Sequence, residues 1–179
     1  MRYFHPALIA LICTLCFPLL SVHAGDGGKL HRNVEEAIRL FKQSDSSIGK
    51  LFKESYGYAV FPKVGKGGFG IGGAYGKGEV YERGKRIGTA SLSQVTIGFQ
   101  LGGQAYIEVI FFEDKESLDN FKSSKFALSA QASAVAAAEG AAANAKYELG
   151  VAIFTLARGG LMFEASVGGQ KFKFAPLNR

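Results

Sequence analysis

The fold is decided by residues 57–78, which read GYAVFPKVGKGGFGIGGAYGKG. Tyr58–Pro62 is a short apolar run that ends in proline, and glycine recurs throughout Lys63–Gly78. Proline interrupts strand pairing and glycine permits tight turns, so this pattern indicates strands joined in a glycine-rich hairpin.

The residues that follow continue the strand pattern. A hairpin is predicted around Arg83-Gly84, where glycine supplies the positive φ of a two-residue turn. Its two strands are Glu79–Glu82 and Lys85–Gly88. Further strands are predicted at Val95–Leu101 and Gln104–Phe112, paired as a hairpin across Gly102-Gly103, and at Val151–Leu156, Leu161–Val167 and Lys171–Phe174, with a turn at Gly168-Gly169. Closely spaced strands with tight turns favour an antiparallel sheet or a partial barrel.

Helical periodicity precedes the strands. Residues Lys29–Gln43 are predicted to form an amphipathic helix. Its apolar stripe consists of Leu30, Val34, Ala37, Ile38 and Phe41. Its opposite face is rich in basic residues, and such a helix can lie on a membrane or dock on its own domain.

Two shorter helices are also predicted. The first has Asp45 or Ser46 as its N-cap, an inner face of Ile48, Leu51 and Phe52, and a stop at Gly57. The second is a short capped helix over Asp114–Phe121, with Leu118 and Phe121 turned inward, and it should pack on the sheet. The alanine-rich stretch 127–145 is helical by propensity, yet it alternates in the manner of a strand, and both readings stay open on pattern alone.

The first 24 residues indicate a secretory signal peptide. Arg2 precedes the apolar run Ala7–Leu20, and Val22-x-Ala24 predicts cleavage before Gly25. Pro18 breaks the run, and its length is short for a membrane anchor. We therefore expect an exported protein, located in the periplasm, on the envelope or outside the cell, with residues 25–179 forming one domain.

The charge of the chain suits an anionic partner. Removing residues 1–24 takes away one basic residue, Arg2, and lowers the formal net charge from +6 to +5. It also removes both cysteines, so the core must hold by packing alone. For an exported protein, lipid headgroups or polyanionic glycans are more plausible counterparts than nucleic acid, although the charge could simply favour solubility.

Nucleotide binding and catalysis are poorly supported. Gly68-x-Gly70-x-x-Gly73 satisfies a dinucleotide fingerprint, but no helix follows it. We predict no catalytic residues, no metal site and no cofactor. His31 has no partner in sequence and is expected to be a solvated residue on the polar side of the first helix. Glu108 is expected on the exposed face of its strand.

A basic surface is the stronger functional signal. The hairpin region contains cations interleaved with aromatic residues: Lys63, Lys66, Lys77, Arg83, Lys85 and Arg86, with Phe61, Phe69, Tyr75 and Tyr81. Cations attract anionic lipid, and aromatic rings suit the membrane interface, although strand alternation should turn at least half of the rings inward.

Residues 57–78, together with SLSQVTIGFQLGGQA at 91–105 and RGGLMFEASVGG at 158–169, resemble the SYLF lipid-binding domain family, in particular its secreted bacterial branch. The resemblance implies binding of phosphoinositides and other anionic lipids, with a contribution from basic residues of the first helix, here Lys29, Arg32, Arg39 and Lys42. Actin binding, known for some eukaryotic members, is not carried over. The resemblance also favours a strand for Phe126–Val135.

The sequence thus predicts an α+β domain in which a glycine-rich antiparallel sheet or partial barrel packs with two or three short helices. The favoured function is peripheral binding of anionic membranes through the first helix and the basic hairpin. The alternative is an envelope protein whose basic face binds a protein or glycan, and an enzyme that uses Glu108 is a distant third.

Overall fold

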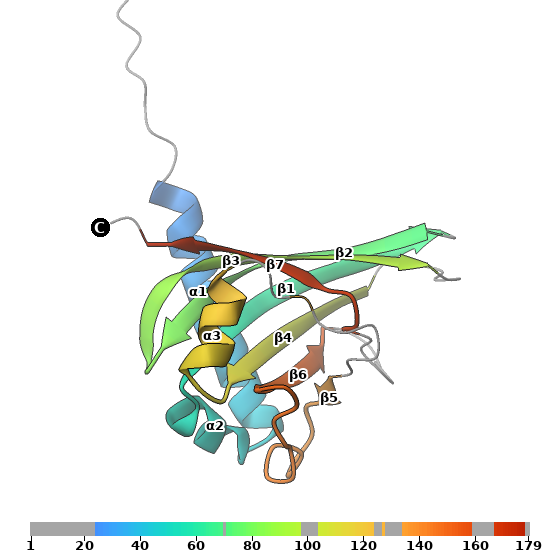
Figure 1. Cartoon of the computed structure of the whole chain (residues 1–179). Coiled ribbons are helices and arrows are strands. Elements are labelled where there is room, and N and C mark those ends of the chain that lie inside the picture. Colours follow the sequence, from blue (N-terminus) through green and yellow to red (C-terminus); the bar gives the residue numbers. More distant parts are fainter. Residues whose placement is uncertain are drawn as a thin grey trace, which may run out of the picture.

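The computed structural model describes residues 24–69, 71–97, 104–123, 127, 134–158 and 167–177. The helices are α1 (Ala24–Ser44), α2 (Ile48–Glu54) and α3 (Lys115–Lys122); the strands are β1 (Gly57–Phe69), β2 (Ile71–Glu82), β3 (Lys85–Ile97), β4 (Gln104–Phe112), β5 (Val135–Ala136), β6 (Val151–Ala157) and β7 (Lys171–Pro176). They form one sheet in the order β5-β6-β4-β1-β2-β3-β7 (Figure 1). Only the β5–β6 pair is parallel among the described strands, and the sheet is not closed into a barrel. The α+β class is confirmed.

The glycine-rich segment forms a long hairpin, β1–β2. Strand β1 does not stop where the apolar run ends at Pro62 but continues to Phe69. An irregularity in the register between Val60 and Lys63 accommodates the proline. Gly78 is needed for close approach, since a Cβ there would lie 2.3 Å from the backbone oxygen of Val60.

The turn between β2 and β3 is confirmed, because Arg83 and Gly84 both have positive φ, 48° and 75°. The second predicted hairpin is wrong. Strand β4 pairs with β1 and β6, whereas β3 pairs with β2 and β7. The strands that flank Gly102-Gly103 in sequence are therefore separated in the sheet by β1 and β2.

Helix α1 docks on one face of the sheet, which we call the α1 face. Val34, Ala37 and Phe41 are fully buried there, against residues of β1, β2, β4 and β6. Tyr58 and Tyr81 stack in this core with ring centroids 4.8 Å apart. Of the two expectations for the amphipathic helix, docking on its own domain is the one observed.

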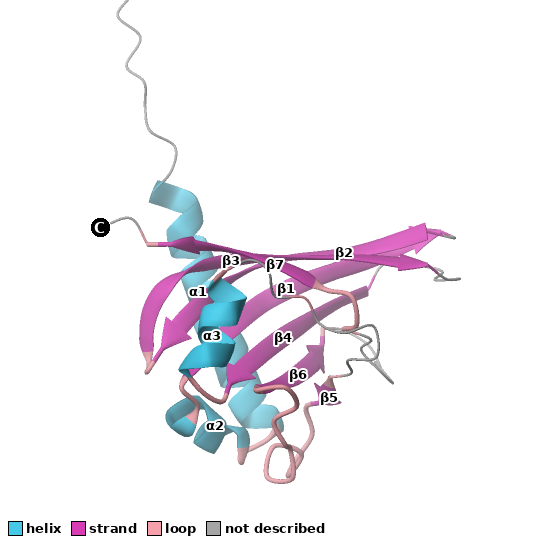
Figure 2. Ribbon diagram, in the orientation of Figure 1, coloured by secondary structure: helices cyan, strands magenta, loops and turns pink. Residues whose placement is uncertain are grey.

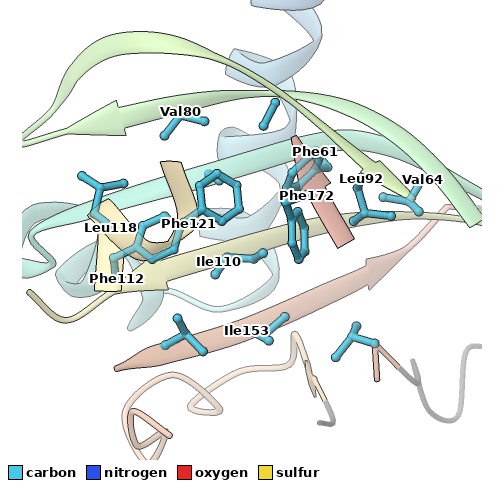
Figure 3. Close-up of a cluster of buried hydrophobic side chains, with 14 of the residues drawn as sticks. Phe61, Val64, Val80, Leu92, Ile110, Phe112, Leu118, Phe121, Ile153 and Phe172 are labelled. Atoms are coloured by element: carbon cyan, nitrogen blue, oxygen red, sulfur yellow. The ribbon is translucent and has the colours of Figure 1, made fainter. Parts of the chain in front are cut away.

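Helix α3 packs on the opposite face, the α3 face, as predicted (Figure 3). Asp114 caps it by accepting a hydrogen bond from the Ser117 backbone nitrogen at 2.8 Å. Phe121 lies between Phe112 and Phe172, with ring centroids 5.0 and 5.1 Å away. Aromatic packing thus joins α3 to the central strand β4 and the edge strand β7.

The connection before α2 differs in detail from its prediction. The N-cap of α2 is Ser47, whereas Asp45 is a fully buried hydrogen-bond acceptor. Its carboxylate accepts hydrogen bonds from the backbone nitrogens of Ser47, Gly140 and Ala142 at 2.9, 3.2 and 2.7 Å. These bonds hold the turns of residues 139–143 against α1, so that part of the alanine-rich stretch is not helical.

Several other predictions fall partly or wholly outside the described residues. These are the signal peptide, most of the predicted strand at 126–135, and residues 161–166 of the predicted strand at 161–167. Strand β6 and strand β7 confirm the predictions for 151–156 and 171–174.

Candidate functional site

Four lysines lie together on the part of the α1 face that the helices leave open. Strand pairing aligns Lys63 of β1 with Lys77 of β2, Lys77 with Ser91 of β3, and Ser91 with Lys173 of β7. Lys171, the fourth, is two residues before Lys173 and points to the same face. All four side chains are exposed. We call Lys63, Lys77, Lys171 and Lys173 the lysine face.

No acidic side chain within the described ranges forms an ion pair with the lysine face. The nearest carboxylate in β2 is Glu79, which is occupied by other donors. His31 Nδ1, Tyr81 Oη and Arg86 Nη1 lie 2.9, 2.7 and 2.7 Å from its oxygens. Because a carboxylate only accepts, Nδ1 of His31 carries the proton.

These contacts set the ionisation of Glu79. Burial raises its pKa, but the hydrogen bonds from His31, Tyr81 and Arg86 outweigh burial and hold the pKa below its usual value. The expectation that His31 is simply a solvated helix residue is wrong, because strand β2 places Glu79 beneath the helix, within hydrogen-bond distance of the His31 ring. Glu79 is thus a structural tie between α1 and the sheet, and it does not neutralise the lysine face.

The lysine face continues into an apolar margin. Tyr75 and Val95, on the same face, are 55% and 77% exposed. Strand register places both residues near the glycine-rich end of the β1–β2 hairpin, because Val95 pairs with Gly73, and Gly73 and Tyr75 pair with Gly67 and Gly65 of β1. Figure 2 shows that β2 and β3 extend past the helices at this end of the sheet. Strands of 13 and 12 residues, as in β1 and β2, are long compared with a typical five or six, and the excess length creates this open surface.

A hollow of about 270 Å³ lies between the start of α1 and the adjoining edge of the lysine face. Its walls include Gly27 and Leu30 of α1, with Lys77, Ser91 and Lys173 on the sheet side. A larger hollow of about 860 Å³ lies by α2 and is lined by residues that include Lys42, Lys50 and Lys53. Lys42 lies over the ring of Phe52, and Lys50 is 3.9 Å from Glu54.

The structure divides the predicted basic hairpin. Lys63 and Lys77 belong to the lysine face, whereas Lys66 pairs with Ala74 on the α3 face. Arg83, Lys85 and Arg86 lie at the β2–β3 turn, at the other end of the hairpin from its glycine-rich tip. Phe61 and Tyr81 are buried, Tyr75 is exposed, and the side chain of Phe69 lies outside the described ones.

The predicted basic residues of α1, Lys29, Arg32, Arg39 and Lys42, are all exposed. They alternate with Glu35 and Glu36, so the outer surface of α1 has mixed charge. The contribution of Lys171 and Lys173 was missed by the sequence analysis. Alternation along β7 was the available signal, but only strand order shows that β7 lies beside β3.

Glu108 is fully buried, so the prediction that it is exposed is wrong. Strand β4 is covered on both faces, and alternation therefore does not separate buried from exposed positions. Gln170 Nε2 donates to Glu108 Oε2 at 3.0 Å, while Glu108 Oε1, Thr155 Oγ1 and Gln170 Oε1 have no hydrogen-bond partner in the described structure. Burial raises the pKa of Glu108 to about 7.

The described residues contain no group of three or more His, Cys, Asp or Glu side chains arranged to hold a metal ion. In the same part of the chain, no helix combines the length and apolar character needed to cross a membrane.

Comparison with known proteins gives two matches. Residues 93–175 match the Ysc84 family, described as "Las17-binding protein actin regulator". The chain is also similar to Beta cell expansion factor A of Aeromonas veronii, with 33% identity over 137 residues, which cover 75% of this chain and 51% of the relative. The chain therefore spans about half the length of that curated relative.

The SYLF resemblance rests on motifs at residues 57–78, 91–105 and 158–169. The Ysc84 match covers the third of these motifs and most of the second. The chain belongs to the SYLF/Ysc84 domain family.

Proposed function

We propose that this protein is a peripheral lipid-binding module that associates with anionic membrane surfaces through the lysine face. Its family is linked to lipid binding and actin regulation. The observation that carries the proposal is a cross-strand row formed by Lys63, Lys77, Ser91 and Lys173. Within this row, Lys63 and Lys77 stand opposite each other on adjacent strands and have no acidic partner among the described residues. Like charges in directly opposed positions destabilise a sheet, so a bound anion would relieve the repulsion.

The magnitude is sufficient for reversible binding. A lysine close to an anionic membrane contributes about 1 kcal/mol, so the four residues of the lysine face together contribute about 4 kcal/mol. Tyr75 and Val95 add exposed apolar surface at the margin of the same face. An aromatic ring and an aliphatic side chain beside cations suit the boundary between headgroups and acyl chains.

Helix α1 has a supporting role in this proposal. Its apolar stripe is buried against the sheet through Val34, Ala37 and Phe41, so insertion of that stripe into a membrane would require undocking. The exposed Lys29, Arg32, Arg39 and Lys42 add long-range attraction, which the acids among them reduce. The sheet, rather than the helix, makes the principal contact.

The proposed setting is outside the cytoplasm, following export by the signal peptide at residues 1–24. The anionic surface would then be one that the exported protein meets, with phosphoinositides as one headgroup class that the family resemblance implies. The protein would act by binding and without catalysis, and its family is not known as enzymatic.

Sedimentation with vesicles tests the proposal. The protein should bind vesicles that contain an anionic lipid and not those of neutral lipid alone, and binding should fall as salt is raised from 50 to 500 mM, roughly. A triple variant should lower the affinity for anionic vesicles at least about a hundredfold, because three attractive contributions become repulsive. Its substitutions are Lys63→Glu, Lys77→Glu and Lys173→Glu.

The matched control reverses three exposed lysines outside the lysine face, Lys50→Glu, Lys53→Glu and Lys146→Glu. We expect these changes to weaken binding less than about threefold. Equal losses in the two variants would show that net charge alone drives binding. No binding to either kind of vesicle would favour the alternative function, an envelope protein that binds a protein or glycan.

A further inference from the structure

We propose that the hollow under the start of α1 is a binding site for a phosphate monoester, with Lys77 and Lys173 as its two cationic arms and Ser91 as its floor. This inference rests on the proposed function, because it names the headgroup chemistry that the lysine face would select. The same chemistry is offered by a lipid headgroup and by a free phosphate ester.

Strand register places the three residues for this task. Lys77, Ser91 and Lys173 occupy one cross-strand row over β2, β3 and β7. Neighbouring strands are about 4.8 Å apart, so the two lysines flank the serine at about 10 Å between their backbones. Two long side chains at this spacing can bring both ammonium groups to one anion above the Ser91 hydroxyl.

Helix α1 closes one side of the hollow without filling it. Gly27 falls on the same helical stripe as Leu30 and Val34, the stripe that faces the sheet. Val34, two turns further along this stripe, is fully buried against the sheet. At Gly27, by contrast, an added Cβ would meet no atom within 4 Å. The absence of a side chain at Gly27 therefore leaves open the space that α1 would otherwise occupy above Lys77 and Lys173.

The size of the hollow favours a headgroup over a lipid chain. Its volume of about 270 Å³ lies just below the range of pockets that enclose drug-sized ligands, about 300–1,000 Å³. Beside the apolar Ala90 and Ala175, its sheet side offers the ammonium groups of two lysines and the hydroxyl groups of Ser91 and Thr89, which are donors suited to phosphate oxygens. An acyl chain would have to desolvate these groups without replacing their hydrogen bonds.

Charge selects a monoester over a diester. A phosphate monoester carries about −1.5 to −2 charge near pH 7, because its second pKa is about 6. The two lysine arms match that charge, and Lys63 and Lys171 increase the local potential. Glu79, the acid next to this row, is already bound by Arg86 and His31 and does not compete for the arms.

An NMR titration with glycerol 3-phosphate tests the site directly. We expect saturable shifts of the Ser91 and Gly27 amide signals, and weaker, non-saturating shifts with the diester glycerophosphoglycerol. Lys77→Gln with Lys173→Gln should weaken monoester binding about tenfold or more, and Ser91→Ala about threefold. The control Lys53→Gln with Lys146→Gln should leave affinity unchanged.

A second variant leaves both lysines in place. Gly27→Glu puts a carboxylate on the stripe above the hollow, at a position where a side chain has space and suits the first turn of a helix. It should keep the fold and weaken monoester binding at least about tenfold. Unchanged monoester affinity in this variant would overturn the assigned position of the site.

Vesicles separate this inference from the proposed function. At matched surface charge, phosphatidic acid should recruit the protein more strongly than phosphatidylglycerol, and glycerol 3-phosphate should compete. Equal recruitment by both lipids without competition would overturn the monoester site and leave electrostatic membrane binding intact. Binding of glycerol 3-phosphate without binding to any vesicle would support the site as one for free phosphate esters and refute the proposed membrane function.

Discussion

Glu79 and Glu108 are glutamates in central strands of one sheet, both almost fully buried, yet their surroundings differ in kind. Glu79, on the α1 face, receives contacts from His31, Tyr81 and Arg86. Glu108, on the α3 face, receives one hydrogen bond, from Gln170, and lies among aromatic and aliphatic residues. The number of donors decides the charge that each site tolerates, since hydrogen bonds favour a carboxylate and burial opposes it.

The difference has opposite consequences for ionisation. The pKa of Glu79 is lowered, because its three donors outweigh burial. The pKa of Glu108 is raised to about 7, because burial outweighs its one donor. Glu79 therefore contributes a charged tie between α1 and the sheet, whereas Glu108 is neutral in its most stable state. The two glutamates therefore lead to opposite predictions for how stability changes with pH.

The largest expected effect is the pH dependence caused by Glu108. The unfolded-state pKa is about 4.5 and the folded-state pKa about 7, so the unfolded chain releases this proton first. The stability that protonated Glu108 contributes should be fully present below about pH 4.5 and should fall by about 3 kcal/mol as pH rises to 7 and above. Denaturant unfolding from pH 4 to pH 9 measures this loss.

Glu108→Gln removes the titration and keeps the shape of the side chain. The difference in unfolding free energy between wild type and this variant should therefore change by about 3 kcal/mol across the same interval of pH. A difference that stays constant with pH would mean that Glu108 reaches solvent or a donor in the native state.

The next effect concerns Glu79. Its lowered pKa means that the stability it contributes is present above about pH 4.5 and is lost as pH falls through the folded-state pKa. Glu79→Gln should cost about 1–3 kcal/mol at pH 7, because the charged acceptor for His31 and Arg86 is removed. As pH falls below about 4.5, the difference in stability between the two proteins should shrink. The same unfolding series measures the gap, and a gap that widens toward acid pH would contradict this assignment.

How far the sequence predicts the molecule depends on what sets each feature. Local chemistry identified the Arg83-Gly84 turn, the Asp114 cap and the stripe of α1, because each is determined by neighbouring residues. Strand order is set by contacts between distant segments. That is why the hairpin across Gly102-Gly103 was predicted wrongly and why Glu108 was assigned to an exposed face.

The candidate site shows the same division. Lys63 and Lys77 could be selected from the sequence, because they lie in one hairpin. Lys173 could not be joined to them, because β7 reaches β3 from the other end of the chain. Lys66 was grouped with them by proximity in sequence, although the fold places it on the opposite face.

The smallest effect concerns the repulsion within the lysine face. Lys63→Gln should increase the free energy of unfolding by a few tenths of a kcal/mol at low salt, because it removes the like-charge pair with Lys77. The gain should vanish as salt screens the charges. Thermal unfolding at two salt concentrations measures it, with Lys146→Gln as the control. A loss of stability at low salt would indicate that Lys63 has an anionic partner within the protein.

The central claim is that the lysine face, and not the α3 face, contacts the membrane. Single cysteines at Val95 and Glu116, both exposed and on opposite sides of the sheet, can carry a fluorophore in protein that lacks residues 1–24 and hence both native cysteines. Anionic vesicles that contain a headgroup quencher should quench the fluorophore at position 95 strongly and the one at position 116 weakly. Equal quenching at both positions, or stronger quenching at 116, would contradict the claim.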